Sequence, residues 1–127
     1  MLPARHRMRR SADYGMAVRL GRRTPRATII LHLVVTDRPE PAKVGFVVTR
    51  SVGGAVVRNT VRRRLRHVVR DHVDMLPDGT LLVVRALPSA ADAPTEQLRR
   101  DFSEGLARAL QRPRHVVAGA PTEQRSS

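Results

Sequence analysis

The 127-residue sequence has no cysteine, no tryptophan and only three aromatic residues, Tyr14, Phe46 and Phe102. The absence of cysteine excludes disulfide bonds and thiolate metal sites, and it suits a reducing compartment. No apolar run approaches the roughly 20 residues of a membrane-spanning helix, and no apolar segment of a secretory signal follows the basic N-terminus. We therefore expect a cytoplasmic protein that does not span a membrane.

The motifs of familiar enzymes are also missing. The five histidines are scattered, and none stands at metal-ligand spacing from another. The sequence contains no GxSxG, HExxH or P-loop motif, and its most basic region has no acid that could hold Mg²⁺. These absences predict no metal site, no tightly bound cofactor, no small-molecule substrate and no independent catalytic centre in the polypeptide.

Acidic residues are scarce in the first part of the chain. The net charge is +13, and 23 arginines but only one lysine supply the positive charge. Residues 1–70 hold 17 basic and three acidic residues, whereas residues 71–127 hold seven and eight. Such segregation indicates a polyanionic partner, with nucleic acid as the first candidate and an anionic membrane surface as the second.

The apolar patterns predict one α+β domain, a sheet with helices against it. The segments are a basic arm that becomes ordered on a partner (1–10), a helix (12–20), a basic loop (22–26), two strands (27–35 and 43–49), a long helix, a central strand (80–85), a last helix (96–111) and a disordered tail (113–127). We expect the first two strands to pair as an antiparallel hairpin. Period-two alternation places Thr28, Ile30, His32 and Val34 on the more open face of the first strand.

The long helix begins after a double glycine and is expected to end near Leu76. Its sequence from residue 53 to 73 is GGAVVRNTVRRRLRHVVRDHV. At about 100° per residue, one side carries an apolar stripe and the other carries arginines. The apolar stripe comprises Val57, Val61, Leu65 and Val68. Arginines also repeat at four-residue spacing from Arg58 to Arg70, which is destabilising unless a polyanion binds. We expect phosphate contacts with strong salt dependence and little base specificity.

Several segments together resemble the signature of the bacterial ribonuclease P protein subunit. They are VGFVVTR (44–50) and GAVVRNTVRRRLR (54–66), preceded by RMRRSADY (7–14) and RLGRR (19–23) and followed by LVVR (82–85). The resemblance extends over residues 5–111. It implies an α-β-β-β-α-β-α two-layer sandwich with a left-handed βαβ crossover, as in the second domain of ribosomal protein S5. The domain would span residues 11–112.

The resemblance also implies a function. The chain would be the accessory subunit of a ribonucleoprotein whose RNA subunit uses Mg²⁺ to remove the 5′ leader of precursor tRNA. The expected contacts with that RNA subunit are Arg58, Asn59, Arg62, Arg63, Arg66 and Arg70. The expected contacts with the single-stranded leader, in a cleft between the first helix and the sheet, are Tyr14, Val18, His32, Arg50 and Arg85.

The sequence departs from the family pattern at several of these positions. Val18 stands where a second aromatic is common and His32 where a tyrosine is common, which implies weaker base stacking. Thr60 replaces an arginine of the helix motif, Ser51 replaces a lysine, and Ala86 follows Arg85 where a second basic residue is common. A structural RNA-binding protein, such as a ribosomal protein, is the alternative. A helix-turn-helix DNA-binding protein is disfavoured because strands flank the arginine helix.

Overall fold

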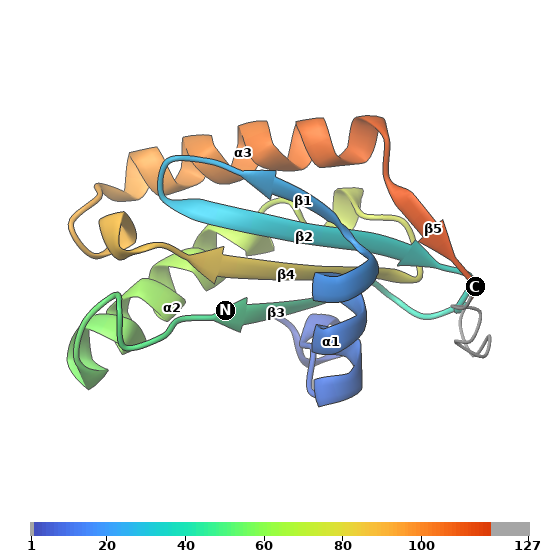
Figure 1. Cartoon of the computed structure of the whole chain (residues 1–127), viewed down its shortest axis with the longest axis horizontal. Coiled ribbons are helices and arrows are strands. Elements are labelled where there is room, and N and C mark those ends of the chain that lie inside the picture. Colours follow the sequence, from blue (N-terminus) through green and yellow to red (C-terminus); the bar gives the residue numbers. More distant parts are fainter. Residues whose placement is uncertain (1, 118–127) are drawn as a thin grey trace.

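The computed structural model describes residues 2–117 and contains one sheet with helices on both faces (Figure 1). The helices are α1 (Ser11–Leu20), α2 (Ala55–Arg70) and α3 (Thr95–Gln111), and the strands are β1 (Arg22–Pro25), β2 (Ile29–Thr36), β3 (Lys43–Val47), β4 (Thr80–Ala86) and β5 (Arg114–Val116). Short 3₁₀ turns lie at Ala4–His6, Val73–Met75 and Pro88–Ala91. The order of elements up to α3 is the α-β-β-β-α-β-α order implied by the resemblance.

The two most apolar strands, β2 and β4, occupy the centre of the sheet. The strand order is β1-β2-β4-β3, and β5 also pairs with β2. β2 and β4 run antiparallel, with Ile29 opposite Ala86 and Val35 opposite Thr80. The predicted hairpin of residues 27–35 and 43–49 is wrong, because β4 lies between these strands and pairs in parallel with β3. A continuous apolar run such as β4 gains most where both of its faces are covered, and only a central position provides this.

The connection from β3 through α2 to β4 is a left-handed crossover, an arrangement that very few parallel strand pairs adopt. In Figure 1 both strands run from right to left, α2 passes behind the sheet, and β4 lies above β3. The crossover predicted from the family resemblance is therefore present. Because α2 is longer than the strands it connects, it extends along the back of the sheet beside α3.

The main core lies between the sheet and the pair α2 and α3. Leu65 of α2, Phe102 of α3 and Leu82 of β4 are fully buried within it. On the opposite face α1 covers only one end of the sheet, over a small cluster that includes Ala17 and Val83. One side of α3 faces this core, since Leu98, Phe102, Leu106 and Ala109 are buried and Leu110 is partly buried.

Both ends of the described chain pack against the sheet. In the arm, the side chains of Leu2 and Met8 are buried, and the Met8 amide donates a hydrogen bond to the Val44 carbonyl over 2.9 Å. Part of the arm therefore packs against the sheet without a partner. At the other end β5 pairs in parallel with the end of β2, so residues 114–116 do not belong to a disordered tail. The rest of the predicted tail, 118–127, lies outside the described residues.

Two element boundaries also differ from the sequence-based expectation. Residues 22–25, expected as part of a loop, form strand β1 and pair antiparallel with β2 from Arg22 to Pro25. The long helix ends at Arg70 instead of near Leu76. Asp71 and His72 leave the helix, and a 3₁₀ turn completes the connection. The apolar periodicity continues through this turn because Val73 is buried as well, so the pattern alone could not locate the end of the helix.

Burial of the α2 stripe is expected to stabilise the whole domain. Replacing Leu65, which is 0% exposed, by alanine should lower the free energy of unfolding by about 2–5 kcal/mol. Val56→Ala on the same helix is the matched control. Val56 is 80% exposed, so its loss should change stability by less than about 0.5 kcal/mol. Urea unfolding of both variants measures this, and equal effects would contradict the burial of the stripe.

Candidate nucleic-acid interface

The arginine helix α2 begins directly after a sharp turn in the backbone. Gly53 has a φ of 158° and Gly54 occupies the N-cap. A side chain at Gly53 would approach the Val57 side chain to 2.8 Å, so glycine allows the chain to turn closely against the first turn of α2. No acidic residue lies in that turn. The N-terminal end of α2 therefore keeps its positive helix dipole without a compensating carboxylate.

The two faces of α2 are divided much as the periodicity predicts. Val61, Leu65, Val68 and Val69 are buried, whereas Val57 is 37% exposed and extends the stripe only partly. On the outer side, Arg63 and Arg66 have no hydrogen bond or ion pair with any described residue. Both guanidinium groups are thus available to an external anion.

Two of the predicted contacts on α2 bond to each other. Arg62 donates a hydrogen bond to the Asn59 side-chain oxygen over 3.1 Å and another to the Val48 carbonyl over 3.4 Å. Arg58 is partly buried, and its Nε has no partner among the described residues. Arg64, the arginine that the resemblance left out of the contact set, instead donates to the Ala93 carbonyl over 3.4 Å. The structure therefore distinguishes Arg64, which ties α2 to the loop before α3, from its outward-facing neighbours.

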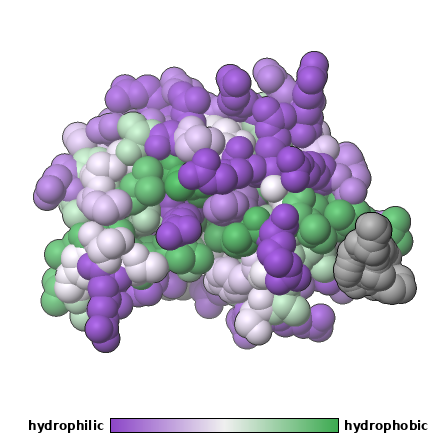
Figure 2. All heavy atoms as spheres, viewed as in Figure 1, coloured by the Kyte–Doolittle hydropathy of each residue, from purple (hydrophilic) through white to green (hydrophobic). Residues whose placement is uncertain are grey.

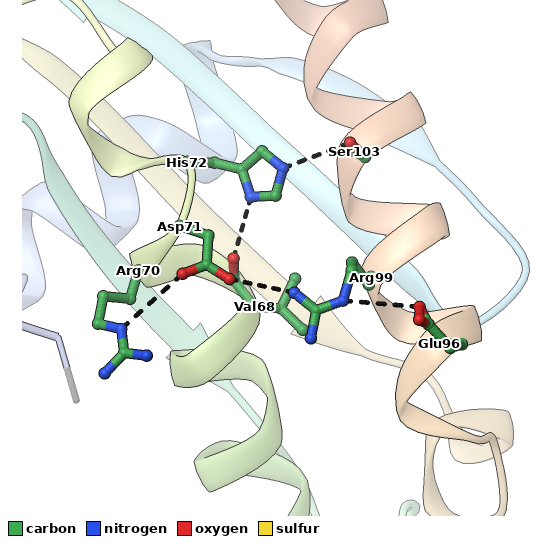
Figure 3. Close-up of polar contacts among 7 residues, drawn as sticks. All are labelled: Val68, Arg70, Asp71, His72, Glu96, Arg99 and Ser103. Atoms are coloured by element: carbon green, nitrogen blue, oxygen red, sulfur yellow. Dashed lines mark hydrogen bonds and ion pairs between the residues drawn. The ribbon is translucent and has the colours of Figure 1, made fainter.

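The C-terminal end of α2 is neutralised by acidic residues and anchored to α3 (Figure 3). Asp71 lies 3.9 Å from Arg70 and 3.1 Å from Arg99, which also pairs with Glu96 over 3.7 Å. His72 makes hydrogen bonds to the Val68 carbonyl and the Ser103 hydroxyl, and its ring meets the Phe102 ring edge-on at 5.3 Å. These contacts partly offset the charge of Arg70. The uncompensated positive surface of α2 is therefore concentrated between Arg58 and Arg66.

A second surface lies on the α1 side of the sheet, where α1 leaves part of the strands uncovered (Figure 1). Strand pairing places Arg23, His32, Val83 and Gly45 in one row across β1, β2, β4 and β3. The ring of Tyr14 lies over Gly45, where an added Cβ would approach the ring carbons to 2.5 Å. Figure 2 shows apolar side chains across the middle of this face with hydrophilic ones around them. Such a face can accommodate bases on its floor and phosphates at its border.

His32 is more enclosed than the strand pattern predicts. All eight residues of β2 are buried, and His32 is only 5% exposed, so the open face expected for Thr28, Ile30, His32 and Val34 is wrong. The reason is that β2 is a central strand with helices on both sides. Burial lowers the pKa of His32 below its ordinary value of 6.5, and the nearby charges of Arg23 and Arg85 lower this pKa further. Its Nδ1 is buried without a partner among the described residues.

The other predicted cleft residues lie on different elements around the row that contains His32. Arg85 is exposed and lies two residues beyond Val83 on the same face of β4. Val18, on α1, is 46% exposed. Arg50 lies three residues beyond the end of β3, in the turn that leads to α2. The fold thus brings His32 and Arg85 together and places Tyr14 two strands away from His32, while Arg50 lies towards α2.

Sequence reasoning missed Arg23 as a member of this site. The residue was assigned to a loop, whereas in β1 it stands directly opposite His32. The sequence holds no clear signal for it, because β1 is too short to show a period and only its pairing with β2 places Arg23 beside His32. Four arginines of the arm and Lys43 also surround a cavity of about 500 Å³, together with Asp13 and Glu40. The basic surface therefore continues from the arm towards β3.

The part of the chain that the structure describes holds neither a metal-ion cluster nor a membrane-spanning helix. Within residues 2–117, no group of three or more histidine, aspartate or glutamate side chains is placed to hold a metal ion. None of the helices described in that range is long and apolar enough to cross a membrane.

Comparison with known proteins identifies the family. The family model for ribonuclease P matches residues 2–110. The chain is 52% identical over 110 residues to the ribonuclease P protein component of Nocardioides sp., covering 85% of this chain and 94% of that protein. It is 49% identical over 118 residues to the protein component of Streptomyces griseus, covering 87% and 96%. The chain belongs to the ribonuclease P protein family.

Solved structures of ribonuclease P proteins have the same fold. The protein from Staphylococcus aureus matches with a TM-score of 0.73 at 21% identity, covering 82% of this chain and 94% of that one. The protein from Thermotoga maritima matches with a TM-score of 0.70 at 21% identity, covering 82% and 97%. As a protein subunit of ribonuclease P, the chain takes part in tRNA processing and has an RNA partner in the complex. This excludes the reading as an unrelated structural RNA-binding protein.

The surroundings of His32 predict a measurable pH dependence. In an NMR titration of the free protein, His32 should titrate below 6.5, and Arg85→Gln should raise its pKa only part of the way, because burial is the larger cause. Since the unfolded chain binds the proton more readily, stability should fall as the pH drops below about 6.5. Arg100→Gln on the exposed side of α3 is the control and should leave this pKa unchanged. An ordinary His32 pKa would contradict the buried environment.

Proposed function

We propose that this chain binds the RNA subunit of ribonuclease P with the outer face of α2, and the single-stranded 5′ leader of precursor tRNA with the α1 face of the sheet. In this proposal the RNA subunit carries out endonucleolytic removal of the leader, and the protein has no catalytic site of its own. The observation that carries the proposal is the pair of unpartnered guanidinium groups at Arg63 and Arg66 on a helix whose other face is buried.

The α2 face suits a folded RNA because its arginines are held on a rigid support. A guanidinium group donates bidentate, charge-assisted hydrogen bonds to phosphate oxygens. The arginines repel one another along the helix, and burial of Val61, Leu65 and Val68 keeps them in place without a partner. A polyanion relieves that repulsion when it binds. Asn59 and Arg62 would act as a pair, because the hydrogen bond between them orients both side chains. Arg58 would extend the contact, whereas Arg70 would contribute less because Asp71 is nearby.

The α1 face suits a single strand because it combines an apolar floor with arginines at its border. The Tyr14 ring offers a π-face that can stack on any base. Val18 offers apolar contact without stacking, and the neutral form of His32, favoured by its lowered pKa, avoids adding a buried charge. Arg85, together with Arg23 and Arg50, would contact the leader phosphates. Recognition of this kind depends on the RNA being single-stranded and on the charge of its phosphates, rather than on its base sequence.

We further propose that any Mg²⁺ used in the reaction is held by the RNA subunit. Among residues 2–117, the two buried carboxylates already have protein partners. Asp13 pairs with Arg38 over 3.0 Å, and Asp101 accepts hydrogen bonds from the Thr28 amide and hydroxyl. A carboxylate that already pairs with an arginine, or that already accepts hydrogen bonds from another segment of the chain, is a poor ligand for Mg²⁺, because this ion requires near-octahedral coordination. The protein would instead raise the affinity for substrate and lower the Mg²⁺ concentration that the RNA requires.

Reconstitution tests this function directly. The full chain should accelerate precursor-tRNA cleavage by a bacterial ribonuclease P RNA at low Mg²⁺. The complex should also bind a precursor with a leader of several nucleotides at least about tenfold more tightly than mature tRNA, since each stacked base adds to the free energy of binding. Binding is measured by filter retention and cleavage by gel. Failure to stimulate cleavage, or equal affinity for precursor and mature tRNA, would contradict the proposal.

A further inference from the structure

A groove at the outer edge of β3 joins the two proposed RNA-binding surfaces. Its cavity of about 320 Å³ is lined by Tyr14 of α1, Phe46 of β3, Arg7 and Arg9 of the arm, and Arg62 and Arg66 of α2. Tyr14 lies on the α1 side of the strand, over Gly45, and Phe46 packs on the other side against the main core. Two of the three aromatic residues of the chain therefore line this groove, one on each side of the strand, while the third, Phe102, is fully buried in the core.

The edge of β3 is open at the middle of this groove. The Val44 carbonyl accepts a hydrogen bond from the Met8 amide, and the Val48 carbonyl accepts one from Arg62. Phe46 lies between them with the same orientation in the strand, so its main-chain N–H and C=O face the same edge. No hydrogen bond from another described residue reaches Phe46 across this edge. The groove thus offers a free donor and a free acceptor beside two partly buried rings.

The charge of the groove favours a nucleic-acid strand. All four of its charged lining side chains are arginines. Arg9 and Arg66 have no bonded partner among the described residues, whereas Arg7 donates to the Leu2 carbonyl and Arg62 to Asn59 and Val48. One free guanidinium group therefore stands on each side of the edge. A base placed in the groove would lie beside both rings, and Arg9 and Arg66 line the same cavity and are available to its phosphates. The cavity is of the size of a small-ligand site and has no room for a base-paired helix.

We propose that this groove holds one unpaired nucleotide of the precursor-tRNA leader, at the point where the leader passes from the RNA subunit on α2 to the cleft on the α1 face. The inference rests on the proposed function and adds Phe46 and Arg9 to the substrate-binding residues. Arg66, which the proposed function gives to the RNA subunit, lines the groove as well and would contact a leader phosphate at the border of the two surfaces. The leader is the occupant because it is single-stranded by nature, so an unstacked base is available without disrupting a folded RNA. The groove also opens towards Tyr14, at the border of the face proposed for the leader, and so extends that face up to α2.

The test combines a protein variant with abasic nucleotides in the leader. Phe46→Leu retains apolar contact with the core and removes the ring, whereas Phe46→Tyr retains the ring and serves as the matched control. With the wild-type holoenzyme, an abasic nucleotide at one leader position should weaken precursor binding about five- to thirtyfold. Phe46→Leu should weaken binding of the intact precursor by a similar factor and remove the effect of that abasic position. Phe46→Tyr should behave like the wild-type chain.

The outcomes separate this inference from the proposed function. If the wild-type chain stimulates cleavage but no leader position is sensitive to an abasic nucleotide, the groove proposal is wrong while the function stands. Phe46→Leu could instead weaken the binding of mature tRNA as much as that of the precursor, or weaken assembly with the RNA subunit. Either result assigns the groove to another RNA and also overturns the groove proposal. Thermal unfolding of Phe46→Leu shows whether the variant folds. A wild-type chain that is insensitive at every leader position overturns the groove proposal whether or not that variant folds.

Discussion

The structure depends on one constraint, which is that several positively charged arginines must be held close together on the single helix α2. Arg58, Arg62 and Arg66 repeat at four-residue spacing on α2, and no carboxylate follows until Asp71. Each such pair destabilises an isolated helix by a few tenths of a kcal/mol. Burial of side chains such as Leu65 contributes about 1.5–3 kcal/mol each, which exceeds the repulsion. The helix can therefore remain folded while it presents a positively charged surface, and a bound polyanion relieves the repulsion on that surface.

The left-handed crossover determines where this surface lies. It places α2 on the back of the sheet beside α3, and it leaves the opposite face to α1 alone. One face of the sheet is thus used for the core, and part of the other remains accessible. The arginine face of α2 and the accessible face of the sheet meet at the edge of β3. A chain of this size can therefore contact a folded RNA and a single strand at once, without a second domain.

Local sequence patterns predicted much of the fold but could not predict strand pairing. The apolar stripe of α2 and the central position of β4 both follow from periodicity and composition, and the structure confirms them. The pairing of β3 with β4 depends on a long-range crossover that no local pattern encodes, so the expected hairpin was wrong. The burial of His32 and its position opposite Arg23 depend on this pairing and on β1, which is too short to show a period. Arg63 and Arg66 were identified correctly as outward-facing, whereas the role of Arg64 required the contact with Ala93.

The central claim is that the arginine face of α2 binds the RNA subunit while the side of Tyr14 binds the substrate. Site-specific photocrosslinking in the reconstituted holoenzyme tests it most directly. A benzophenone derivative of phenylalanine at position 14 resembles the tyrosine it replaces, and the same residue at position 63 lies on the exposed side of α2. The account predicts crosslinks from position 63 to the RNA subunit and from position 14 to the leader of precursor tRNA. Crosslinks from position 63 to the leader, or from both positions to the same RNA, would contradict it.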